Sequence, residues 1–160
     1  MKELPHRIMN FLDDYRYRNI YRSDNIAIYQ PFSIDHPPWF VYVIAYDDEL
    51  YISDLSYEYN KILLFSPLPY YFKKNRISKQ LNLVLKSITK DLTENLSREN
   101  NLKKDVLEAG LCFIACENDS YLLGFYAIVI EEIEEDIFKK VIHKLIIAST
   151  KGQAEIDKNY

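Results

Sequence analysis

The segment from Trp39 to Tyr46 constrains the fold more than any other part of the chain. It is almost wholly apolar, is rich in valine, isoleucine and aromatic residues, and lies between Pro37-Pro38 and Asp47-Asp48. Residues of this kind favour strands, and the flanking prolines and aspartates favour turns. We therefore expect a strand in the middle of a sheet.

Similar runs, bounded by turn residues, predict four further strands. They cover residues 25–30, 49–54, 111–116 and 121–130. The segment 57–72 has an irregular pattern and holds Pro67 and Pro69. Because proline is confined to edge strands or bulges, we expect a long connection here rather than a central strand.

Apolar residues at steps of three and four predict three helices, over residues 4–15, 77–92 and 131–149. The first helix should fade between Tyr17 and Ser23. A short turn of helix over 103–109 should end at Gly110. The last helix begins with acidic residues and continues with basic ones, the order that the helix dipole favours. Beyond Ser149 the chain is small and polar, so we expect residues 150–160 to form a mobile tail.

The predicted order is therefore α-β-β-β-α-β-β-α. Such an order is typical of an α+β fold, with helices on one face of an antiparallel sheet of about five strands. The length of 160 residues fits one such domain, over residues 1–149.

Composition excludes several classes of protein. Only three glycines occur, whereas phosphate-binding loops need several at close spacing. The longest apolar run, from Tyr121 to Ile130, is half of the roughly 20 residues that a membrane helix needs, and the first residues do not resemble a signal peptide. Cys112 and Cys116 would lie too far apart on one strand for a disulfide, which suggests buried thiols in a reducing cytoplasm. We expect no cofactor and no metal.

Charge and aromatic residues are unevenly distributed. The net charge is −4, yet residues 70–104 hold nine basic and three acidic residues. Two strings mix tyrosines with cations, and they supply the candidate binding residues: Tyr15, Arg16, Tyr17, Arg18, Tyr21 and Arg22, and Tyr70, Tyr71, Lys73, Lys74 and Arg76. Rings that stack on bases, beside cations that neutralise phosphates, suit single-stranded nucleic acid. Tyrosine and arginine are also enriched at protein interfaces, and the same residues can simply pack at a surface.

No catalytic signature is present. The densest polar constellation comprises Asp35 and His36, with Asp54 farther along, and it could form an enzyme site with a histidine base. Adjacent residues rarely aim at one point, and the neighbouring prolines favour a turn. We therefore predict no catalytic residues and keep this site as an alternative.

Two resemblances bear on function. The string from Asp24 to His36, followed by Phe40-Val41-Tyr42 and Tyr51-Ile52-Ser53-Asp54, resembles an uncharacterised family of small phage and bacterial proteins. That family has Asp-Asp-Gly-Tyr where this chain has Ser53-Asp54-Leu55-Ser56. The resemblance implies a phage or mobile-element protein. The element order is similar to that of type III secretion chaperones, which are small, acidic, usually dimeric proteins that bind peptide segments.

The sequence thus favours a non-enzymatic, cytoplasmic protein-binding accessory factor. It would be an inhibitor, an immunity-like factor or a chaperone-like factor with an unidentified protein partner, and a homodimer is one possible form. A single-stranded nucleic-acid-binding protein is the second hypothesis. An enzyme centred on Asp35, His36 and Asp54 is the third.

Overall fold

The computed structural model describes residues 3–13, 17–31, 40–46, 61–73, 78–98, 104–115 and 120–159. Within these ranges the elements are α1 (His6–Leu12), β1 (Tyr17–Arg22), β2 (Ile26–Pro31), β3 (Val41–Tyr46), β4 (Lys61–Lys73), α2 (Lys79–Arg98), β5 (Val106–Ala115), β6 (Ser120–Ile130) and α4 (Glu135–Asn159). The strands form one antiparallel sheet in the order β1-β2-β3-β4-β6-β5. The predicted α+β class is confirmed, with six strands in place of about five.

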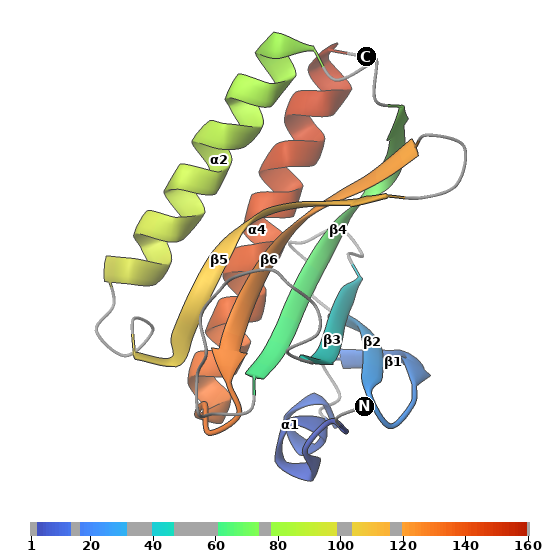
Figure 1. Cartoon of the computed structure of the whole chain (residues 1–160), viewed down its shortest axis with the longest axis vertical. Coiled ribbons are helices and arrows are strands. Elements are labelled where there is room, and N and C mark those ends of the chain that lie inside the picture. The colour runs from blue at the N-terminus through green and yellow to red at the C-terminus, as the bar shows by residue number, and fades with distance from the viewer. Residues whose placement is uncertain are drawn as a thin grey trace.

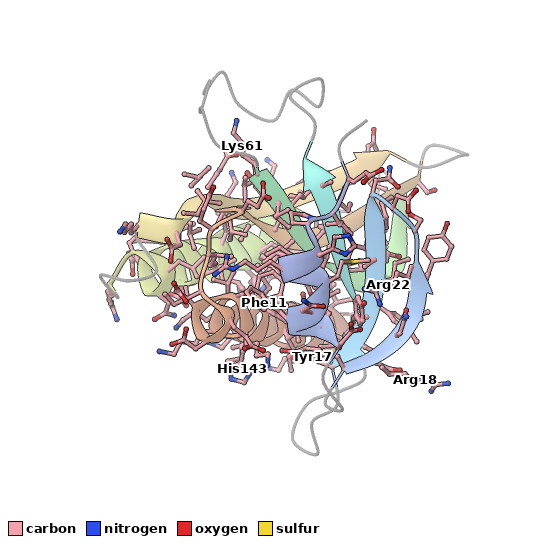
Figure 2. All side chains as sticks on the ribbon, turned by 90° about the horizontal axis from the view of Figure 1, so that it is seen from below. Phe11, Tyr17, Arg18, Arg22, Lys61 and His143 are labelled. Atoms are coloured by element: carbon pink, nitrogen blue, oxygen red, sulfur yellow. The ribbon has the colours of Figure 1, made fainter. Side chains whose placement is uncertain are left out.

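The helices share one face of the sheet (Figures 1 and 2). α2 and α4 pack against each other and cover β4, β5 and β6. α1 lies at the other end of the same face, where the amide of Leu4 donates to the carbonyl of Asp24 over 2.7 Å. We call the side of the sheet that bears the helices the inner face and the opposite side the outer face.

β3 is the central strand that the Trp39–Tyr46 pattern predicts. It pairs with β2 on one side and with β4 on the other. Val41, Val43 and Ala45 are buried against the inner face, and the residues between them are half-buried. This period of two is what a strand in the middle of a sheet requires. The prediction is confirmed for Val41–Tyr46, and Trp39 lies outside the described residues.

The expectation of an irregular connection over 57–72 is wrong over residues 61–72, which belong to β4, the longest strand of the sheet, and residues 57–60 lie outside the described residues. The pairing of β4 with β3 ends at Phe65, so no β3 residue is paired with Pro67. The amide hydrogen that proline lacks is therefore not required for a hydrogen bond to β3. The pairing with β6 shifts register between Pro67 and Tyr71. Prolines are tolerated at such places, where the hydrogen-bonded ladder is already open.

Two boundaries in the N-terminal part also differ from the prediction. α1 ends at Leu12 instead of continuing to residue 15, and the segment expected to be the fading end of that helix is β1. β1 pairs along its length with β2, so its strand conformation depends on a neighbour rather than on its own pattern. The predicted strand over 49–54 lies outside the described residues.

Two boundaries in the C-terminal part differ as well. β5 begins at Val106, within the predicted helical turn over 103–109. α4 continues to Asn159, so the mobile tail expected over 150–160 is wrong for residues 150–159, and Tyr160 lies outside the described residues. Gly152 and Ile156 are buried on this last part of α4, and Gly152 faces Phe125 and Leu68. One apolar residue per turn therefore suffices to hold the helix against the sheet.

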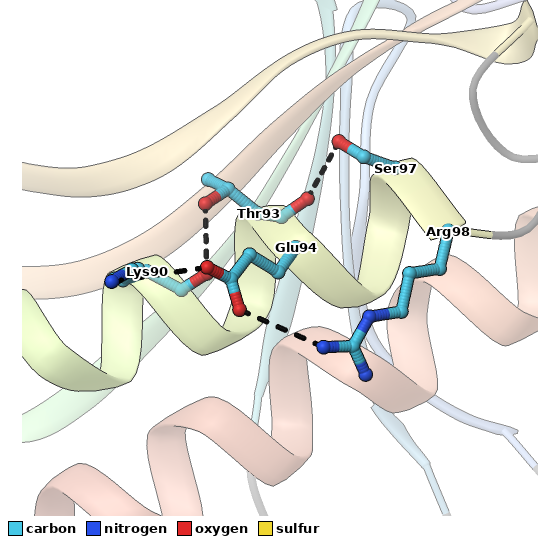
Figure 3. A network of polar contacts seen from close by, with 5 residues as sticks. All are labelled: Lys90, Thr93, Glu94, Ser97 and Arg98. Carbon is cyan, nitrogen blue, oxygen red and sulfur yellow. Dashed lines mark hydrogen bonds and ion pairs between the residues drawn. The ribbon is translucent and has the colours of Figure 1, made fainter.

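Two cations of the basic stretch, Lys90 and Arg98, make contacts within α2 itself. Glu94 lies between Lys90 and Arg98, at 4.0 and 3.8 Å (Figure 3). On the same exposed side, the hydroxyls of Thr93 and Ser97 donate to the carbonyls of Lys90 and Thr93. Exposed pairs of this kind contribute about 0.3–0.5 kcal/mol each. We interpret this side of α2 as a solvated surface.

Candidate functional site

A row of side chains crosses the outer face of the sheet. The pairing registers place Tyr21 beside Ile28, Ile28 beside Tyr42, Tyr42 beside Phe65, and Phe65 beside Tyr126. The ring centroids of Tyr42 and Phe65 are 5.9 Å apart. Directly opposed side chains are the closest neighbours across a sheet, so the row is continuous over five strands. We call these five residues the aromatic row.

Two glycines let the rings of this row lie on the sheet. A side chain at Gly124 would overlap the Phe65 ring and would lie 2.7 Å from the carbonyl oxygen of Ser66. A side chain at Gly110 would lie 3.3 Å from the Tyr126 ring. Glycine removes the Cβ that would lift these rings, and this allows close contact with the backbone.

The aromatic row becomes exposed toward β1. Phe65, in β4, is 2% exposed, whereas Tyr21 is 54% exposed. Ile20 beside it is 44% exposed, and Arg18 is exposed on the same strand. We call Arg18, Ile20 and Tyr21 the edge surface. An exposed apolar pair next to a cation, at the end of a partly buried row, is typical of a contact surface.

A β-bulge divides the first predicted string between the two faces. Asn19 pairs with Tyr29 and Tyr21 with Ile28, which leaves Ile20 as the extra residue. Arg18 and Tyr21 consequently lie on the outer face, while Tyr17 and Arg22 lie on the inner face. Figure 2 shows Arg22 directed toward α1 and Arg18 directed away from the protein.

The inner members of the string hold α1 and α4 in place. The Arg22 guanidinium donates to the Asp13 carboxylate over 3.2 Å. The Lys139 ammonium of α4 lies 6.0 Å from the centroid of the Tyr17 ring. Burial raises the pKa of the nearby Tyr29 hydroxyl, an effect that Arg22 opposes and Asp13 supports. Tyr17 and Arg22 thus contact other parts of the protein, as the interpretation of the string as surface packing predicts.

The structure does not bring the two predicted strings together. Tyr70, Tyr71 and Lys73 belong to the last part of β4, which lies at the opposite end of the long axis from β1 (Figure 1). Their side chains lie outside the described part of the structure, as do Tyr15, Arg16, Lys74 and Arg76. β1 and the last part of β4 therefore do not form one continuous groove lined by both strings.

A second polar region lies beside α1, around a cleft of about 270 Å³ whose lining includes His6, Lys61 and Glu131. Lys61 is only 5% exposed. Burial raises the pKa of the Glu108 carboxyl, and Lys61 opposes this effect. Burial also raises the pKa of Asp105, with smaller opposing effects from Lys104 and Arg7 and a supporting one from Glu134.

This region holds α1 against the start of α4. Arg7 donates to the carbonyl of Glu131 over 3.0 Å and lies 3.9 Å from the Glu134 carboxylate. In the described ranges, no three histidine, cysteine, aspartate or glutamate side chains gather as a metal site would require. Asp35, His36 and Asp54, the alternative enzyme site, all lie outside those ranges, so that alternative stays a prediction.

Cys112, on β5, is a half-buried free thiol, and burial raises its pKa. A raised pKa keeps the thiol protonated and unreactive. Cys116 lies outside the described residues. None of the helices in the described ranges is long and apolar enough to cross a membrane.

Comparisons with protein-family models, with curated proteins and with solved structures gave no match. The two resemblances drawn from the sequence therefore stay predictions. Sequence reasoning identified Arg18 and Tyr21 as candidate binding residues, but it did not identify Ile20 or the other four members of the aromatic row, Ile28, Tyr42, Phe65 and Tyr126. The alternation of residues along each regular strand predicts the face on which its side chains lie. Only the registers between strands show that the five side chains lie next to one another.

Proposed function

We propose that this chain is a non-enzymatic protein-binding accessory factor, of the inhibitor, immunity-like or chaperone-like kind, and that its edge surface contacts the partner. The observation that carries the proposal is the exposure of Ile20 and Tyr21, side by side on a strand at the end of the sheet. Burying such residues against a partner removes apolar area from water at a modest cost in side-chain entropy. Arg18 beside them adds a cation that can make directed hydrogen bonds.

Single-stranded nucleic acid is the alternative ligand. Two features weaken it: the strings lie at opposite ends of the sheet, and Tyr17 and Arg22 contact other parts of the chain. Binding that depends on phosphates must weaken steeply as the salt concentration rises. Titration of a labelled oligonucleotide at two salt concentrations therefore separates this alternative from protein binding.

Site-specific photocrosslinking tests the proposal. A photoreactive amino acid replaces Tyr21 in one variant and Leu83 in a matched control, since Leu83 is 67% exposed on α2. We expect protein crosslinks from position 21 that are absent from position 83 and are reduced by Ile20→Lys. Equal crosslinking at both positions, or none at position 21, would contradict the proposal, and nuclease-sensitive products would support the alternative.

A further inference from the structure

β1 has a free edge. It pairs with β2 on one side, and no strand in the described ranges lies on its other side. The unpaired backbone groups of an edge strand can bind another strand. Charged side chains and bulges normally discourage such pairing, and β1 has both: Arg18, Arg22 and the bulge at Ile20. A strand that fits this edge must therefore match both the charges and the bulge.

The sequence of β1 is complementary to itself. Its residues run Tyr-Arg-Asn-Ile-Tyr-Arg from Tyr17 to Arg22. When two copies lie antiparallel about their common centre, Arg18 of each copy faces Tyr21 of the other, and Tyr17 faces Arg22. Arg18 therefore meets an aromatic ring, which is a favourable contact, Arg22 keeps its ion pair with Asp13, and no arginine meets another arginine.

The bulge makes this pairing geometrically consistent. Side chains that face each other across two strands must lie on the same face of the sheet. In a regular strand, Arg18 and Tyr21 are three residues apart and would lie on opposite faces. Because of the extra residue Ile20, both lie on the outer face, while Tyr17 and Arg22 both lie on the inner face. A second copy carries the same bulge at the symmetric position, whereas a regular strand does not.

We propose that the free edge of β1 binds β1 of a second copy of this chain, in an antiparallel pairing that joins the two sheets about a two-fold axis. This inference rests on the proposed function, because it names the partner of the same edge surface. In a pairing about a two-fold axis, each favourable contact occurs twice. It also joins the outer faces of the two sheets into one continuous face.

The dimer should be reversible. The edge has six residues, and a contact of that length buries less than the roughly 1,200 Å² typical of a stable interface. We therefore expect dissociation in the micromolar range. An acidic strand of another protein is the competing occupant, since it would also suit Arg18 and Arg22, but it would lack the matching bulge.

Sedimentation velocity over a range of micromolar concentrations tests the pairing. The Tyr21→Arg variant places a new arginine opposite Arg18 of the second copy, twice per dimer, and removes two cation–aromatic contacts. We expect the dissociation constant to rise roughly 100-fold. Adding Arg18→Glu places a carboxylate opposite each new arginine and should restore the dimer. Leu83→Arg, at an exposed position of α2, is the matched control and should leave the dimer unchanged.

Three results would overturn the inference: a wild-type chain that stays monomeric, a dimer that survives Tyr21→Arg, or a double variant that does not recover. Failure of the inference can be told apart from failure of the proposed function. If the wild-type chain is monomeric and position 21 crosslinks to a different protein, only the inference fails. If position 21 crosslinks to no protein at all, both fail.

Discussion

β4, β5 and β6 are ten to thirteen residues long and are covered by α2 and α4, whereas β1, β2 and β3 have six residues each and lie beside the seven-residue α1. We call these the long-strand half and the short-strand half. Both halves have fully buried side chains, such as Leu64 in the first and Tyr29 in the second, and each has an exposed apolar residue on its outermost strand, Phe113 in β5 and Ile20 in β1. From the longer strands and helices we expect more of the stability to lie in the long-strand half, and our proposal places the contact surface in the short-strand half, on β1.

The largest effect on stability should come from Phe138→Ala in α4. Phe138 is fully buried, and its ring lies 5.5 Å from that of Phe11 in α1, which joins the two halves. Removing a buried ring costs about 3–5 kcal/mol through lost burial and the cavity left behind. Urea unfolding measures this loss. A loss below about 1 kcal/mol, the size typical of an exposed site, would contradict the assignment of stability to the long-strand half.

Phe11→Ala sharpens the same comparison. Phe11 is 8% exposed and lies on a helix of seven residues. A short helix can shift into the space that the ring leaves, so the cost should be smaller than for Phe138→Ala. An equal or larger cost would mean that the short-strand half stabilises the fold as much as the long-strand half does.

Two glycine substitutions in the long-strand half should have opposite outcomes. Gly124→Ala would overlap the Phe65 ring and the Ser66 carbonyl, and overpacking of this kind costs about 1–3 kcal/mol. Gly152→Ala, in α4, would make ordinary contacts of 3.4 Å and longer with Phe125 and Leu68. Alanine also stabilises a helix interior by roughly 0.5–1 kcal/mol relative to glycine. Thermal unfolding compares the two variants, and a Gly124→Ala variant as stable as the wild type would disprove the close contact.

A buried pair of hydroxyls links β4 to α4. The Oγ atoms of Ser66 and Ser149 are 2.8 Å apart, and Ser149 also donates to the Ser66 carbonyl over 3.1 Å. Replacing either serine by alanine leaves the other hydroxyl with one partner fewer, at a cost of about 1 kcal/mol. The double variant should cost less than the sum of the single ones, because each change removes the same bond. Additive losses in urea unfolding would contradict a shared hydrogen bond.

The smallest effect on stability should come from the edge surface. Ile20→Ser changes a side chain that is 44% exposed on an edge strand, and such changes alter stability by less than about 0.5 kcal/mol. The same variant should weaken crosslinking from position 21, because the exposed apolar pair is lost. A large loss of stability with unchanged crosslinking would reverse the roles assigned to the two halves.

The sequence predicts those helices and strands whose own pattern of apolar residues is sufficient to identify them. β3 has an apolar run bounded by turn residues, and α2 has a stripe buried over about four turns, formed by Leu81, Leu85, Ile88, Leu92 and Leu96. β1 has no such pattern, since five of its six residues are exposed and its conformation comes from pairing with β2. Pro67 argues against a strand over residues 61–73, but it is tolerated because the pairing of β4 with β3 ends at Phe65 and the pairing with β6 shifts register between Pro67 and Tyr71.

The same limit applies to the candidate site. Alternation of tyrosine and arginine marks the string that holds Arg18 and Tyr21. The face on which each residue lies depends on the bulge at Ile20, and a bulge is a property of the paired strands. The aromatic row likewise depends on registers between strands that are far apart in sequence, such as β4 and β6.

Hydrogen exchange, measured residue by residue as the chain concentration rises, tests most directly whether the β1 end of the sheet is the contact surface. At low concentration, we expect amides of β6 to be strongly protected and those of β1 to exchange much faster, since edge strands open locally. As the concentration rises, protection should increase in Tyr17–Arg22 and nowhere else in the sheet. Equal protection of β1 and β6 at low concentration, or new protection that appears on α2 or β5 instead, would contradict the account.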